Sequence, residues 1–78
     1  MPDIRHVSVN YDPEANGWWA ESDDVPGLVT EAPTWEGLIE RVVAVVPELM
    51  EANEPGVGTI TLVFEGQFHA ERQVLAAA

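Results

Sequence analysis

The chain has 78 residues, 46% of them hydrophobic, and it contains no cysteine. This predicts one small domain, residues 1–78, with a modest core and no disulfide bonds. Fourteen acidic residues oppose three arginines, for a formal net charge of −11. Because Lys and Arg supply most of the affinity for phosphates, this charge argues against direct nucleic-acid binding and against docking on anionic membranes. No apolar stretch has the length of a membrane span or the character of a signal peptide, so we expect a cytoplasmic protein.

The first part of the chain has the pattern of three short strands. Apolar and polar residues alternate over residues 4–11, which predicts a half-buried strand. Residues 12–17 have turn chemistry, with Pro early and Asn-Gly late, and a second strand is expected over residues 18–22. A Pro-Gly step at residues 26–27 interrupts the pattern. A short third strand is then expected over residues 28–31.

An amphipathic helix is predicted over Trp35–Ala52, with Thr34 as its N-cap. Its apolar residues recur at helical spacing as far as Met50, so one face should lie on the core. Pro47 falls inside this stretch. Because the apolar phase continues beyond it, we expect one kinked helix with Pro47 on the solvent side.

The last part of the chain predicts a hairpin. Residues 58–64 alternate strongly and predict a strand, Glu65-Gly66 fits a two-residue turn, and a fifth strand is expected over residues 67–74. The element order is therefore β-β-β-α-β-β. Since one helix covers only one face of a sheet, we predict an α+β two-layer sandwich in which one helix lies on an antiparallel sheet. The second sheet face should be open or used in assembly.

Two groups of polar residues are candidates for a metal or catalytic site. Glu21, Asp23 and Asp24 lie close together at a strand end, where carboxylates can bind a divalent metal. A solvated acidic turn is the simpler interpretation, because a nuclease also needs basic residues for its substrate. His6 and His69 are far apart in the sequence and there is no Cys to complete a zinc site. We therefore expect no enzyme activity, no metal and no cofactor.

Two adjacent tryptophans, Trp18 and Trp19, must point to opposite faces of the sheet. One can pack beneath the helix, while the other lies on the far face. There it is either an anchor for another protein, since Trp is common at binding hot spots, or a partly exposed residue packed on a neighbouring strand.

Several short motifs follow one another in the first part of the chain. They are the hairpin of residues 11–20, the acidic Pro-Gly segment Ser22–Leu28, Thr30-Glu31-Ala32, Thr34-Trp35-Glu36 and Pro47-Glu48-Leu49. Together they cover about Arg5 to Asn53 and resemble the HicB-like family, the antitoxin half of a bacterial toxin–antitoxin pair. The match is nearest to a short branch that lacks a C-terminal DNA-binding domain.

This resemblance implies a partial RNase H-like fold without nuclease activity. It also implies that the protein binds and masks a small basic toxin of the HicA type, which cleaves mRNA. Too few residues follow the fourth strand for a DNA-binding region, so direct operator binding is not expected. An acidic surface suits this partner, because complementary charge speeds association.

We place the expected partner contact on the second strand and on the acidic turn after it. The residues concerned are Trp18, Trp19, Asp23, Asp24, Val25, Pro26 and Gly27. A homodimer through a free sheet edge or the open face is also expected, since so small a core gains from association. The alternative function is a stand-alone, self-associating small domain with no toxin, and a third is an enzyme with metal-binding carboxylates around Asp23.

Overall fold

The computed structural model describes residues 3–77 of the chain. Its elements are β1 (Ile4–Asp12), β2 (Gly17–Glu21), β3 (Val29–Ala32), α1 (Trp35–Asn53), β4 (Gly58–Gly66) and β5 (Ala70–Ala77). The predicted α+β class and the order β-β-β-α-β-β are confirmed. Within residues 3–77, no helix is both long and apolar enough to cross a membrane.

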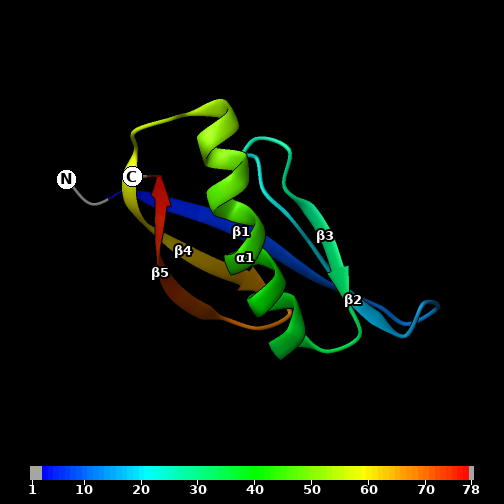
Figure 1. The fold of residues 1–78 in the computed structure, drawn as a ribbon. Coiled ribbons are helices and arrows are strands. Elements are labelled where there is room, and N and C mark those ends of the chain that lie inside the picture. Colours follow the sequence, from blue (N-terminus) through cyan, green and yellow to red (C-terminus); the bar gives the residue numbers. More distant parts are fainter. Residues whose placement is uncertain (1–2, 78) are drawn as a thin grey trace.

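The five strands form one curled sheet in the order β3-β2-β1-β4-β5 (Figure 1). Three strand pairs are antiparallel, but β1 and β4 run parallel, with Ile4 opposite Thr61 and Val9 opposite Gly66. The sheet is therefore mixed, whereas we predicted an antiparallel one. The helix carries the chain from one edge of the sheet past β2 and β1, so that β4 returns in the direction of β1. Strand alternation alone does not specify this direction.

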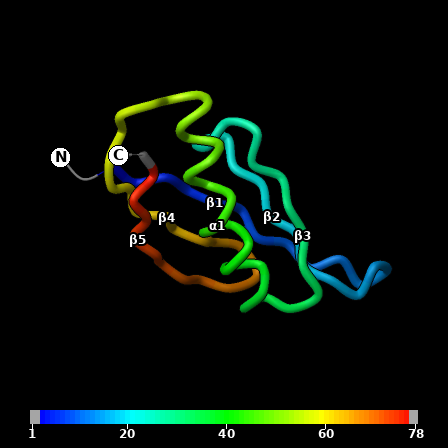
Figure 2. The backbone as a smooth tube through the Cα atoms, in the orientation of Figure 1, coloured from blue at the N-terminus to red at the C-terminus, as the bar shows by residue number. Residues whose placement is uncertain are grey.

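The helix α1 lies across one face of the sheet (Figure 2), and the buried side chains of the core lie between these two layers. Alternation along the strands sends Val7, Val9, Ile60, Leu62 and Phe64 towards the helix, and all are buried. Among residues 3–77, no helix or strand packs on the other face of the sheet. The fold is thus the expected two-layer sandwich with one open face.

The helix begins where the sequence predicts, because Thr34 Oγ1 accepts the Gly37 N–H at 3.1 Å as an N-cap. It continues through Pro47 to Asn53. Its buried residues are those of the predicted apolar face: Leu38, Ile39, Val42, Val46 and Met50. Pro47 is half-buried at the border of this face rather than on the solvent side.

The predicted two-residue turn at Glu65-Gly66 is wrong. Both residues belong to β4, and the connection to β5 is residues 67–69. The cause lies in β1: Gly66 pairs with Val9, and the Gln67 N–H donates to Val9 O at 3.2 Å. This long-range pairing prolongs β4, and the fifth strand accordingly begins later than predicted.

The connection between β2 and β3 is not a simple surface loop. Val25 and Leu28 are buried in the core, and the Leu28 N–H donates to Val25 O at 3.1 Å. Gly27 makes the reversal possible with φ of 83°, a conformation that residues with a Cβ rarely adopt. Two apolar side chains therefore fix an acidic segment against the sheet.

Candidate functional site

An acidic hollow lies on the open face where β1, β2 and β4 meet the β2–β3 connection. Its volume is about 560 Å³. The lining residues are His6, Ser8, Glu21, Ser22, Asp23, Asp24, Glu65 and Gly66. Four of these eight residues carry carboxylate side chains, so the surface of the hollow is strongly acidic.

The sheet register explains how these carboxylates come together. Ser8 on β1 lies opposite Glu21 on β2 and opposite Glu65 on the parallel strand β4. The ring of His6, two residues before Ser8, contacts the Glu65 carboxylate through Nδ1. The side chains of His6 and Glu65 are 59% and 52% exposed, so both remain accessible to a partner.

At the rim of the hollow, side chains form the hydrogen bonds to β1 that a neighbouring strand would otherwise form. β2 leaves β1 after Glu21, and beyond that point Ser22 Oγ donates to His6 O at 2.5 Å. Asp24 Oδ2 accepts the His6 main-chain N–H at 2.8 Å. Ser22 Oγ also accepts the Asp24 and Val25 N–H groups at 3.0 and 3.2 Å. Ser22 and Asp24 therefore bond to β1 as a further strand would.

Arg5 ties three separate segments together behind this rim. Its guanidinium pairs with Asp3 at 2.6 Å and with Glu54 at 2.8 Å, and it donates to Asp24 O at 2.7 Å. The Arg5 hydrogen bonds hold the pKa values of the Asp3 and Glu54 carboxyls below their ordinary range. Conversely, the hydrogen bonds to Asp3 and Glu54 raise the pKa of the Arg5 guanidinium. Sequence reasoning did not find this cluster, because residues 3 and 54 give no local sign of meeting.

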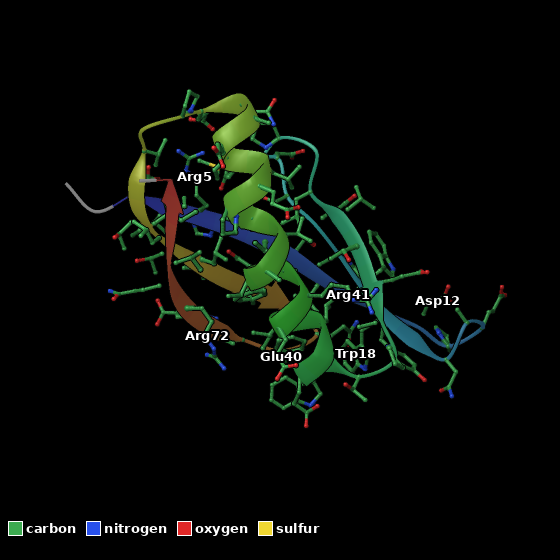
Figure 3. All side chains as sticks on the ribbon, viewed as in Figure 1. Arg5, Asp12, Trp18, Glu40, Arg41 and Arg72 are labelled. Carbon is green, nitrogen blue, oxygen red and sulfur yellow. The ribbon has the colours of Figure 1, made fainter. Side chains whose placement is uncertain are left out.

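Trp18, one of the predicted contact residues, belongs to an aromatic cluster on the helix side of the sheet. Its ring lies 5.0 Å from that of Tyr11 and 5.6 Å from that of Phe68, which in turn lies 5.0 Å from Trp35. Figure 3 shows Trp18 and Arg5 near opposite ends of the helix. Trp18 thus closes one end of the core.

Trp19 takes the opposite face, as the alternation requires. It lies between Asn10 on β1 and Glu31 on β3 and is half-buried. It is therefore the tryptophan of β2 that lies on the open face, on the strand that also contributes Glu21 to the acidic hollow.

Of the other predicted contact residues, some lie on the surface and one lies in the core. Asp23, Pro26 and Gly27 are exposed, while Val25 is completely buried. Asp24 is exposed, but its carboxylate is engaged with β1. The prediction missed Ser8 and Glu65, which reach the hollow only because β4 runs beside β1.

A second, smaller hollow of about 310 Å³ lies at the end of the β1–β2 hairpin. Trp18, Trp19, Glu31 and Arg41 contribute to its walls, together with the hairpin turn. Within residues 3–77, no three His, Asp or Glu side chains are grouped so that they could hold a metal ion. His6 lies on β1 and His69 in the β4–β5 connection.

Comparison with other proteins places the chain in a family. No curated protein matches it significantly. It is similar to the crystal structure of hypothetical protein TTHA1013 from the extremely thermophilic bacterium Thermus thermophilus, with 42% sequence identity and a TM-score of 0.74. That match covers 83% of this chain and 93% of the other. Residues 4–76 match the family described as "Domain of unknown function (DUF1902)". The chain therefore belongs to the DUF1902 family.

Proposed function

We propose that this protein is a non-enzymatic binding module whose acidic open face receives a small basic protein. The partner that the HicB-like resemblance suggests is a toxin of the HicA type, which the module would mask. The observation that carries the proposal is the hollow of about 560 Å³ lined by Glu21, Asp23, Asp24 and Glu65 on an uncovered sheet face.

The charges of this surface favour a basic partner over other macromolecules. Within residues 3–77 no arginine lines the hollow, and Arg5, which donates to Asp24 O behind the rim, is already paired with Asp3 and Glu54. Among residues 3–77, His6 is the only basic residue in the lining. A face of this kind repels nucleic acid and attracts a cationic protein, whose association it also accelerates. An RNA-cleaving toxin needs a cationic surface to hold its substrate, and that surface is complementary to this one.

Within the predicted contact region, the structure suggests which residues act directly. Asp23 and Pro26 are exposed, and the half-buried Trp19 supplies an apolar surface two residues before Glu21 on the same face of β2. The buried side chain of Val25 anchors the β2–β3 connection in the core, and Gly27 allows the chain to turn there. Trp18 belongs to the core cluster and supports the site indirectly. An aromatic anchor next to charged groups is a common arrangement at protein interfaces.

Capture of the partner tests this proposal. The tagged chain is used as bait in native lysate at low salt, and bound proteins are identified by mass spectrometry. We expect a small basic protein in near-stoichiometric amount that is released when salt is raised. The captured protein, purified alone, should cleave RNA, and addition of this chain should stop the cleavage. A partner that cleaves RNA equally well in the presence of this chain would contradict the toxin-masking role.

The second candidate function is a stand-alone domain that associates with itself. One observation favours it: the edge strand β5 carries no net charge in a strongly acidic chain. Self-association at β5 and partner binding at the acidic hollow would use different parts of the sheet, so each can be tested separately.

A further inference from the structure

We propose that two copies of this chain pair antiparallel along the free edge of β5 and so join their sheets into one. β5 lies at the end of the strand order and pairs only with β4. An edge strand presents a row of main-chain N–H and C=O groups without a strand partner, and such an edge readily accepts another strand. The free edge of β5 is a different surface from the acidic hollow.

Charge identifies the occupant as a second copy. The residues of β5, Ala70–Ala77, include one Glu and one Arg and are therefore neutral, although the chain carries −11. The opposite edge strand, β3, contains Glu31 and follows the acidic residues Asp23 and Asp24. Like charges facing each other across strands destabilise the pair. Two acidic copies therefore repel each other less along β5 than along β3. The acidic β3 side repels a second copy and favours a basic partner.

The two edges also differ in their protection against strand addition. β3 has four residues and lies between Pro26 and Pro33, and short edges and nearby prolines hinder pairing. β5 has eight residues, none of them Pro. Its Leu75 is 63% exposed on the open face, opposite Thr59 of β4. Pairing along β5 would cover part of this apolar side chain.

On the edge strand β5, a side chain already satisfies one main-chain acceptor. Glu71 O accepts a hydrogen bond from Arg72 Nη1 at 2.7 Å, so a side chain of the same strand satisfies it. Figure 3 shows the Arg72 side chain extending outward from β5. With a two-fold axis at Gln73, Glu71 lies opposite Leu75 of the second copy. Arg72 then lies opposite Val74, and no two like charges face each other.

The salt dependence of the affinity distinguishes this dimerisation from the binding of a basic partner. Because each copy is strongly acidic, salt screens the long-range repulsion between two copies, and the dimer should become tighter as salt rises. Binding of a basic partner at the acidic hollow should instead weaken. The two proposals therefore predict opposite salt responses and can fail independently.

Sedimentation velocity of the full chain tests the proposal, from about 10 µM to about 1 mM, at low salt and at about 0.5 M salt. We expect a concentration-dependent dimer that salt strengthens. Gln73→Glu and Gln73→Lys should each weaken the dimer about fivefold or more, because like charges then meet at or beside the axis. Mixing the two variants should restore association, since opposite charges meet. A wild-type chain that stays monomeric throughout would overturn the proposal.

A matched pair of variants identifies the edge. Leu75→Glu and Val29→Glu each place a carboxylate on the open face of an edge strand, at side chains that are 63% and 74% exposed. Leu75→Glu should abolish the dimer and leave capture of the basic partner intact, while Val29→Glu should leave the dimer intact. Circular dichroism confirms that both variants are folded. Dimer loss in Val29→Glu, or an intact dimer in Leu75→Glu, would rule out β5 as the interface.

Discussion

The carboxylate of Asp24 accepts the main-chain N–H of His6 at 2.8 Å, at a point where β2 has already turned away from β1. Asp24, an acidic residue of the candidate site, thus also stabilises the position of the β2–β3 connection against β1. We predict that Asp24→Ala lowers the free energy of unfolding by about 1 kcal/mol, because an exposed hydrogen bond to a charged acceptor is lost. Asp23→Ala should change it little. Urea unfolding of both variants measures the difference, and equal effects would contradict the assignment.

The approach of β4 to β1 depends on a glycine. Gly66 has φ of 123°, and a Cβ there would lie 2.3 Å from Val9 O. We predict that Gly66→Ala destabilises the fold by about 3 kcal/mol or more, since both the conformation and the contact must change.

Gly56 provides the control for this variant. It has φ of 81°, but a Cβ there would meet no atom within 4 Å. Gly56→Ala should therefore cost only about 1 kcal/mol. Comparable losses for the two variants in urea unfolding would show that the close approach at Val9 is unimportant.

The Arg5 cluster predicts an acid-sensitive contribution to stability. The Asp3 and Glu54 pKa values lie below the ordinary values of 3.8 and 4.5 because Arg5 donates hydrogen bonds to both carboxylates. Depressed pKa values contribute stability above the ordinary values, and this contribution is lost as the pH falls through the folded-state values. The stability difference between wild type and Arg5→Gln should thus be constant near neutral pH and shrink below about pH 4. Thermal melts across this range test it, and a difference independent of pH would refute it.

Substitution of Trp18 should mainly lower the stability of the fold, whereas substitution of Trp19 should mainly weaken partner binding. Trp18→Ala removes a ring that packs on Tyr11 and Phe68, and should lower the free energy of unfolding by about 2–4 kcal/mol. Trp19→Ala should cost less, because within residues 3–77 no helix or strand packs on its face of the sheet, but it should weaken partner capture. Chemical unfolding and capture by the tagged variants provide the two readouts. A Trp19→Ala variant that captures the partner normally would exclude Trp19 as an anchor.

Local patterns in the sequence were sufficient to predict the elements. Alternation located the strands, and Thr34 with the apolar spacing up to Met50 located the helix, since both signals depend only on neighbouring residues. The parallel direction of β4 and the extension of that strand to Gly66 depend on β1, which is more than fifty residues earlier in the chain. No local signal encodes such a pairing.

The same distinction between local and long-range information applies to the candidate site. The acidic segment around Asp23 was visible in the sequence, but Glu65 joins it only through the register between β1 and β4. We predict Val25 as part of the surface contact that extends from Asp23 to Gly27. Its apolar side chain instead fills the core. Burial within an otherwise polar connection depends on the space beneath it, which the sequence does not reveal.

We propose that the acidic hollow itself, rather than the total charge of the chain, holds the basic partner. This claim is tested by titrating the captured partner into two double variants with the same net charge. Glu21→Lys with Glu65→Lys reverses charge in the hollow, and Glu40→Lys with Glu48→Lys does so on the exposed face of the helix. We predict that calorimetry at low salt shows affinity lost by about a hundredfold for the first pair and by less than about fivefold for the second. Equal losses for both pairs, or unchanged affinity for the first, would contradict the claim.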